Sequence, residues 1–240
     1  MHYRQLNNWP IDRPTALAVE EEVAAQVDLY GDLADPGLIA AVDCAYGRDG
    51  RTLHAAAVVV TFPELIEVER AFHVSRLEFP YAPGLLYFRE GPAILNALGK
   101  LTHEPEIIIV HGHGLAHPRR CGIACYVGVA FERPTIGCAR RLLAGRHAPV
   151  APAKGSSEKI IIDGRQVGVA RRTKDNVKPV FISPGYRCDI AQAQDMVVRS
   201  LRGFRLPEPL RLAHLLANKH KRHAKKKNEH NSRRRETPSV

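Results

Sequence analysis

Three consecutive strand patterns near the start of the chain constrain its fold more than any other feature. Residues 38–46, 52–62 and 65–74 are apolar or alternate between apolar and polar residues, and the Asp-Gly pair at 49–50 is a hairpin turn signal. Strands joined by such short turns pair antiparallel with their neighbours. Residues 107–110 then form a continuous apolar run, which is typical of a strand buried on both faces. The sequence therefore predicts a sheet that begins as a meander and gains an inner strand.

The rest of the chain alternates between helix and strand patterns. The first helix is indicated by Val19, Val23 and Val27, which recur at helical spacing within residues 15–29. Early strands followed by such alternation predict an α/β fold with a mixed β-sheet flanked by helices. The further elements predicted are helices over 89–101, 121–131, 190–201 and 210–219, strands over 135–139 and 179–183, and a hairpin over 159–170.

The positive charge of the chain is concentrated at its carboxyl end. The net charge is +10, and residues 211–240 contribute +8 of it. Residues 219–240 include runs of three lysines and of three arginines but almost no apolar side chain, so they cannot bury enough surface to fold by themselves. We expect one domain over residues 1–218 and a disordered basic tail over 219–240. Such a tail either binds phosphate groups or serves only solubility.

The cysteines and the amino-terminal residues indicate a compartment. Five cysteines, with no Cys-x-x-Cys spacing, indicate neither a disulfide framework nor a structural zinc site, which favours a reducing cytoplasm. The chain begins without an apolar segment of the signal-peptide type, and no stretch approaches the ~18 apolar residues of a membrane helix. The sequence thus predicts a cytoplasmic protein without a membrane partner, and we expect a monomer.

Two short stretches have the composition of a binding site. Residues 80–90 read PYAPGLLYFRE, in which Pro80 and Pro83 restrict the backbone around Tyr81 and present its ring at low entropic cost. A rigid exposed aromatic ring of this kind suits a wedge that enters a stack of bases. Residues 110–120 read VHGHGLAHPRR, and their glycines let backbone approach a planar ligand. Together the stretches suit a pocket for a flipped base.

These stretches resemble endonuclease V, a family of metal-dependent nucleases that cut near deaminated purines, chiefly hypoxanthine. The resemblance continues in order through 38–43 (LIAAVD), 133–139 (RPTIGCA) and 203–209 (GFRLPEP), up to His214. It implies a ribonuclease H-like fold and the hydrolysis of a phosphodiester bond on the 3′ side of a lesion such as deoxyinosine. The partner it implies is DNA, with inosine-containing RNA as an alternative, and the cofactor is a divalent metal ion, Mg²⁺ in the family.

The resemblance also assigns roles to individual residues. Asp43 and the residue at position 111 would bind the metal, and Glu90 and His214 would complete the catalytic set. By itself Asp43 would be read as a turn or cap residue, but a carboxylate within LIAAVDCA needs a cation to offset its desolvation. The DNA-binding residues implied are Pro80, Tyr81, Pro83 and Arg140, and the base pocket implied is formed by Gly84, Leu86, Gly112, Gly114, Ile123 and Ala139.

The chain departs from the family pattern at the metal site. The family reads VDGHG after the apolar strand, whereas this chain has His111 in place of the aspartate. A milder departure is Arg140, which stands where the family has a lysine and keeps the charge. Because Mg²⁺ prefers oxygen ligands and imidazole suits softer ions, we expect a slower nuclease that prefers Mn²⁺ or a softer ion.

Three other interpretations remain open from the sequence. A chain that has lost a metal-binding acid could bind hypoxanthine lesions without cleaving them. His111, His113 and His117 could together form a zinc site, although alternating histidines are weak evidence for one. A nearby acid, Asp163 or Asp175, could replace the missing carboxylate in the folded chain.

Overall fold

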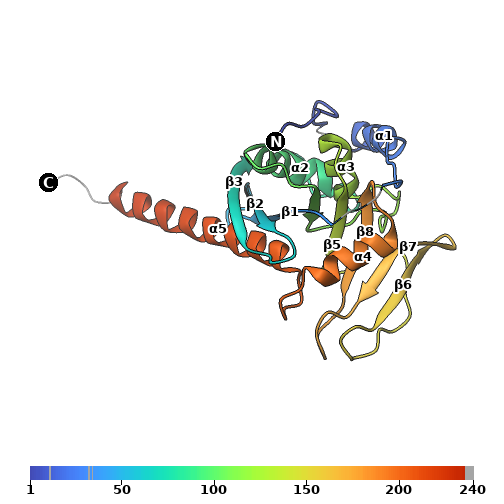
Figure 1. Cartoon of the computed structure of the whole chain (residues 1–240). Helices are drawn as coiled ribbons and strands as arrows, with labels where there is room; N and C mark the ends of the chain where they lie inside the picture. Colours follow the sequence, from blue (N-terminus) through green and yellow to red (C-terminus); the bar gives the residue numbers. More distant parts are fainter. Residues whose placement is uncertain (11, 32, 34, 236–240) are drawn as a thin grey trace.

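The computed structural model describes residues 1–10, 12–31, 33 and 35–235, and an eight-stranded mixed sheet forms its centre (Figure 1). The strand order is β3-β2-β1-β4-β5-β8-β7-β6. β4 lies parallel to β1 and β5, whereas the other neighbouring strands pair antiparallel. The strands are β1 (Leu38–Tyr46), β2 (Thr52–Thr61), β3 (Glu67–Arg76), β4 (Ile107–Val110), β5 (Thr135–Ala139), β6 (Ser157–Ile162), β7 (Arg165–Arg171) and β8 (Val180–Tyr186).

Helices cover both faces of this sheet. The apolar residues of α1 (Arg13–Ala24), α2 (Leu86–Gly99) and α3 (Ile123–Phe131) form one core with the sheet. Those of α4 (Ile190–Arg199) and the first turns of α5 (Glu208–Arg235) form a second core on the opposite face. The predicted mixed sheet flanked by helices is confirmed.

The inner strands are buried because each carries apolar side chains toward both cores. In β1, Ile39 and Ala41 belong to the core with α4 and α5, whereas Ala40 and Val42 belong to the core with α1 to α3. This alternation follows from the two-residue period of a strand. β4 is buried at all four positions, as its continuous apolar run predicts.

Several predicted boundaries are correct and others shift by a few residues. β5 has the predicted bounds, whereas α1 begins at Arg13, after the Asp12 cap that accepts a hydrogen bond from the Thr15 amide, and ends at Ala24. α2 begins at Leu86 and not at residue 89, because the chain enters the helix directly after the turn at Gly84, whose φ is +77°.

The basic tail is the main difference from the sequence expectation. Helix α5 continues to Arg235, so residues 219–235 are helical where composition predicted disorder. Lys, Arg and Ala are good helix formers, and the first turns of α5 pack on β1 and β2, which provides the nucleus that an isolated helix lacks. The boundary at 218/219 therefore falls inside a helix, the division into two regions stays a prediction, and residues 236–240 lie outside the described residues.

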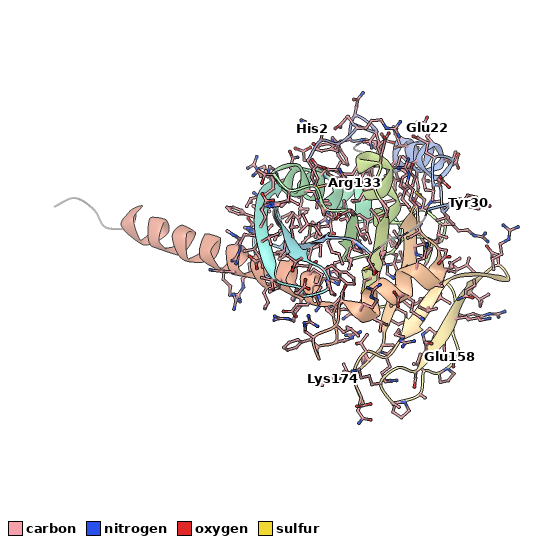
Figure 2. The ribbon with its side chains drawn as sticks, in the orientation of Figure 1. His2, Glu22, Tyr30, Arg133, Glu158 and Lys174 are labelled. Atoms are coloured by element: carbon pink, nitrogen blue, oxygen red, sulfur yellow. The ribbon has the colours of Figure 1, made fainter. Side chains whose placement is uncertain are left out.

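The strands at the β6 end of the sheet extend away from the helical layers. Figure 2 places Glu158 of β6 and Lys174, which follows β7, at the end of the molecule opposite His2 and Glu22. A small third core, which includes Ile160 and Phe181, supports this region. No helix in the described part of the chain is both long and apolar enough to span a bilayer.

Candidate active site

The candidate site lies at the carboxyl ends of the neighbouring parallel strands β1 and β4. Val42 pairs with Val110, and the amide of His111 continues the ladder by donating to the Val42 carbonyl at 3.0 Å. This register brings position 111 beside Asp43. The strand period directs Asp43 toward the face covered by α5, which carries His214.

Asp43 is held between two histidines. Its carboxylate is only 3% exposed, with Oδ1 2.5 Å from Nδ1 of His111 and Oδ2 2.6 Å from Nδ1 of His214. The backbone amide of Cys44 also donates to Oδ1, at 2.7 Å. The buried acid is thereby compensated on both oxygens, as its apolar surroundings require.

The two histidines determine the ionisation of this acid. Burial acts to raise the pKa of Asp43, but the hydrogen bonds and charges of His111 and His214 outweigh burial and hold the pKa at about 2. Asp43 is therefore ionised at neutral pH. A buried carboxylate that stays charged is suited to attract a cation.

Glu90 lies in the first turns of α2 and faces the same cleft. Its Oε1 accepts a hydrogen bond of 2.7 Å from the hydroxyl of Tyr46, the last residue of β1. Burial raises the pKa of Glu90 to about 7, although the Tyr46 hydrogen bond acts in the opposite direction. Glu90 is not hydrogen-bonded to Asp43 and can exchange a proton near neutral pH.

An open cleft of about 640 Å³ connects these groups with a basic wall. The wall contains Arg140, Arg141, Lys178 and Arg205, and none of these cations forms an ion pair with an acid of the described residues. Arg205 is fixed by hydrogen bonds to the carbonyls of Arg140 and Pro179, at 2.7 and 2.8 Å. Unpaired cations that line the same cleft as an acidic centre suit the binding of a polyanion.

The donor atoms in this cleft fit a divalent ion by their chemistry but are not arranged as a preformed metal site. Among the described side chains no three acidic, histidine or cysteine groups surround a common point. Both oxygens of Asp43 are instead engaged by imidazole nitrogens. Asp43 and His111 would offer one oxygen and one nitrogen donor, and nitrogen donors are better matched to softer ions than to Mg²⁺.

The proline-flanked aromatic is presented to solvent as the sequence predicts. Tyr81 is 76% exposed, and Pro80 and Pro83 beside it are exposed as well. The loop that carries them joins β3 to α2, close to the cleft through Leu86.

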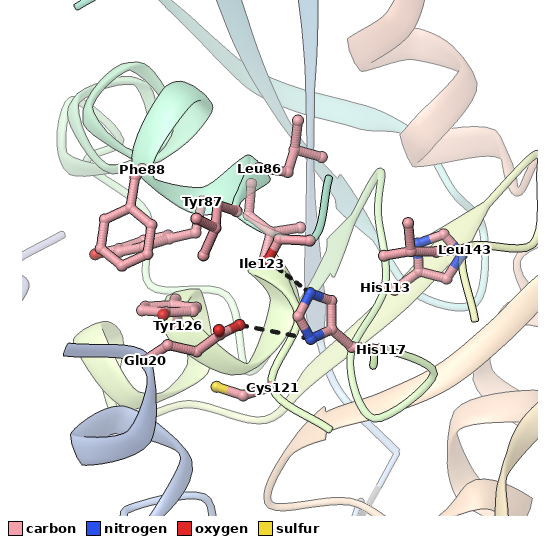
Figure 3. Close-up of a pocket in the computed structure, with 13 residues that line it drawn as sticks. Glu20, Leu86, Tyr87, Phe88, His113, His117, Cys121, Ile123, Tyr126 and Leu143 are labelled. Atoms are coloured by element: carbon pink, nitrogen blue, oxygen red, sulfur yellow. Dashed lines mark hydrogen bonds and ion pairs between the residues drawn. The ribbon is translucent and has the colours of Figure 1, made fainter. Parts of the chain in front are cut away.

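The residues implied for the base pocket fall into three groups. Gly84, Leu86 and Ile123 line a narrow cavity of about 20 Å³, shown in Figure 3, which has room for about one water molecule. Gly112 and Ala139 line the larger cleft, as does Leu86. Gly114 lines neither cavity. A Cβ at Gly114 would lie 1.9 Å from the carbonyl oxygen of Pro184, so only a glycine leaves room for this oxygen.

The zinc cluster considered from the sequence is not assembled. His113 is bonded through Nε2 to the Arg141 carbonyl at 3.0 Å, whereas His117 is bonded through Nε2 to the Gly84 carbonyl at 2.8 Å. Neither Asp163 nor Asp175 lines the cleft. Asp163 is exposed beside Arg120, and Asp175 accepts a hydrogen bond from the Lys154 amide, so neither replaces the missing carboxylate.

Comparison with known proteins decides the family. A model of the endonuclease V family matches residues 21–215. The chain belongs to the endonuclease V family. Endonuclease V of Gloeobacter violaceus is 42% identical over 216 residues, which cover 89% of this chain and 88% of that protein.

Solved structures of the family share the fold. Endonuclease V from Streptomyces avermitilis matches with a TM-score of 0.85 and 36% identity, over 91% of this chain and 96% of that one. The Ciona intestinalis enzyme was solved in complex with a 24mer DNA containing an inosine followed by a ribo-adenosine. It matches with a TM-score of 0.77 at 24% identity, over 88% of this chain and 98% of that chain. The ribonuclease H-like fold implied by the resemblance is confirmed, and membership makes the chain a nuclease of the endonuclease V type.

Some residues of the cleft were not found from the sequence. Tyr46, Arg141, Lys178 and Arg205 line it beside the predicted residues. Arg141 directly follows Arg140, and Arg205 lies within the matched GFRLPEP segment, so both had a sequence signal. Lys178 had none, because it reaches the cleft from the loop before β8.

Proposed function

We propose that this protein hydrolyses a phosphodiester bond in DNA on the 3′ side of a deaminated purine such as deoxyinosine. The observation that carries the proposal is the buried carboxylate of Asp43, held between His111 and His214 in a cleft that unpaired cations also line. An acidic centre facing unpaired cations is the arrangement that a nuclease needs, because cations hold the phosphates while the centre acts on one of them. The inosine-containing DNA in the Ciona intestinalis complex supports this substrate class.

The basic wall and the exposed loop would bind and orient the substrate. Arg140 and its neighbours would hold backbone phosphates, and Tyr81, restricted by Pro80 and Pro83, would enter the base stack. The displaced base would enter the space near Gly84 and Ile123. Since that cavity has a volume of only about 20 Å³, a base can occupy it only after the walls move apart.

Asp43 and His111 would hold a divalent metal ion. Such an ion activates water and neutralises charge on the phosphate when it is bound. His111 supplies nitrogen where the family has a carboxylate, so we propose that Mn²⁺ or a softer ion serves better than Mg²⁺.

Glu90 and His214 would move or stabilise protons beside the reacting phosphate. Glu90 can accept or release a proton at its carboxylate near neutral pH, because burial raises its pKa to about 7 and Tyr46 keeps it oriented. His214 orients Asp43 through its Nδ1, and Asn218 fixes that helical turn by donating to the His214 carbonyl at 2.9 Å.

A nicking assay tests the proposal. The full chain is incubated with a duplex that contains one deoxyinosine and with the same duplex containing adenine, each with Mn²⁺. We expect a nick on the 3′ side of inosine only, and its loss by about a thousandfold or more in Asp43→Ala. Equal cutting of both duplexes, or cutting that survives Asp43→Ala, would refute the proposal. A strand with inosine in RNA tests the alternative substrate.

One observation favours a second candidate function, a lesion-binding protein that does not cleave. Nδ1 of His111 forms a hydrogen bond with Oδ1 of Asp43, whereas the family pattern has a second carboxylate at position 111. In that case the native chain binds the inosine duplex selectively but nicks it only after His111→Asp. A cytoplasmic location and a monomeric state stay predictions.

A further inference from the structure

The carbonyl of Gly84 ends the loop that carries Tyr81 and receives two side-chain hydrogen bonds. Nε2 of His117 donates to it at 2.8 Å, and Nη2 of Arg119 donates to it at 2.9 Å. Gly84 has a φ of +77°, and a Cβ there would lie 3.2 Å from Arg119 Nη2 and 3.4 Å from His117 Nε2. This position therefore combines a glycine-specific backbone with a closely packed pair of donors.

A buried acid from another element holds these donors. Glu20 of α1 is 1% exposed and accepts a hydrogen bond from Nε of Arg119, so the guanidinium bridges Glu20 and the Gly84 carbonyl. Figure 3 shows Glu20 pointing at His117 across the narrow cavity, with Nδ1 of His117 at 3.5 Å from Glu20 Oε1. Glu20 is separated from Arg119 by 99 residues in sequence, so only the folded chain forms this contact.

The protonation of His117 follows from its partners. Its Nδ1 accepts from the Arg119 amide at 3.3 Å, so the ring proton stands on Nε2 and is donated to Gly84. Burial lowers the pKa of His117 to about 4, which keeps the ring neutral at physiological pH. The cation that compensates Glu20 is therefore Arg119.

The opposite end of the loop is fixed in the same way. Nη1 of Arg89 donates to the carbonyl of Phe79 at 2.7 Å. Residues 80–83 lie between the two fixed carbonyls, and Tyr81 projects from them into solvent. The proline rings restrict the loop internally, whereas the side chains of Arg89, His117 and Arg119 fix where it starts and ends.

We propose that Glu20 is a positioning residue, which sets the Tyr81 loop for insertion into DNA by holding Arg119 against the Gly84 carbonyl. This inference rests on the proposed role of Tyr81 in the nuclease. Glu20 does not reach the cleft that contains Asp43, so it acts through the loop and not on the reacting phosphate. Without Glu20 the guanidinium loses its only acidic partner among the described residues, and one of the two donors to Gly84 is released.

A double-mutant cycle tests the route of this effect. Binding of full-length protein to duplexes with inosine or with adenine is measured by fluorescence anisotropy, without divalent ions so that no cleavage occurs. Glu20→Ala and Tyr81→Ala should each lower the preference for inosine by about tenfold or more. The double variant should prefer inosine no less than Tyr81→Ala does, because Glu20 is proposed to act only by positioning the Tyr81 loop. Additive losses would overturn the inference.

Hydrogen exchange provides a readout that needs no substrate. Glu20→Ala should speed exchange of the backbone amides in residues 79–86, whereas Glu20→Gln should keep most of the protection because its amide oxygen still accepts from Arg119. Glu22→Ala, an exposed acid of the same helix, is the matched control. Exchange in Glu20→Ala that matches the Glu22→Ala control would overturn the inference. A native chain that lacks preference for inosine would instead refute the proposed function, while the exchange result still decides the role of Glu20.

Discussion

At position 111 a single residue changes the electrostatics of the site. The family pattern has an aspartate at this position, whereas here an imidazole nitrogen lies 2.5 Å from Asp43 and compensates it within the chain. The charge of Asp43 is thus compensated by neighbouring side chains of the same chain. In the proposed metal site, this contact would have to lengthen for Asp43 to hold an ion.

Replacing His111 should reverse this balance. His111→Asp places a second acid beside Asp43, so we expect the unliganded variant to lose about 1–3 kcal/mol of stability and to recover it when Mg²⁺ is added. Thermal unfolding of the native and variant chains with and without Mg²⁺ measures both effects, and His111→Asn separates the loss of the histidine from the gain of charge. This account of position 111 would be contradicted if His111→Asp unfolded at the native temperature and if Mg²⁺ did not change that temperature.

His117 should make stability depend on pH. Its pKa is lowered from 6.5 to about 4 by burial, so between these values the unfolded chain binds a proton that the folded chain does not. The contribution of neutral His117 to the free energy of unfolding is therefore fully present above pH 6.5. About 3 kcal/mol of it is lost as the pH falls toward 4. Urea unfolding measured between pH 6.5 and 4 should show that the free energy of unfolding falls less steeply in His117→Gln than in the native chain. Parallel curves for the two proteins would show that His117 is not buried in its neutral form.

At the scale of elements, glycines allow the loop after β4 to approach β8. A Cβ on Gly114 would lie 1.9 Å from the Pro184 carbonyl oxygen, which is fixed in the strand. Gly114→Ala should therefore destabilise the fold by about 1–3 kcal/mol or more. Gly37→Ala, where the nearest atom is a flexible Glu106 oxygen at 3.5 Å, is the control. Equal melting temperatures for the two variants would disprove the close approach.

Local patterns predicted the elements well, and contacts distant in sequence explain what was missed. The strand at 135–139 and the burial of Asp43 followed from apolar runs, which reflect local composition. The Glu20 and Arg119 pair had no local signal because its members are 99 residues apart. The helical continuation of α5 past residue 218 was missed because low hydrophobicity excludes a core but does not exclude a helix.

At the scale of the whole molecule, the basic charge is divided between the cleft wall and the end of the chain. Residues 223–240 contain six lysines and arginines beyond the part of α5 that packs on the sheet. A chain ending at Arg222 should bind DNA more weakly and with a smaller salt dependence, because fewer counterions are released. Its preference for inosine should be unchanged, since we propose that the Tyr81 loop and the pocket near Gly84 recognise the base. Binding titrations at several salt concentrations measure the slope, and an unchanged slope would assign phosphate binding to the cleft alone.

The most direct measurement of the central claim is the rate of nicking of a single-inosine duplex in Mn²⁺ and in Mg²⁺, for the native chain, His111→Asp and Asp43→Ala. We predict that the native chain is at least about tenfold faster in Mn²⁺, because His111 supplies nitrogen in place of oxygen. His111→Asp should raise the Mg²⁺ rate, and Asp43→Ala should be inactive in both ions. Equal native rates in the two ions, with no response to His111→Asp, would contradict the assignment of position 111 to the metal site.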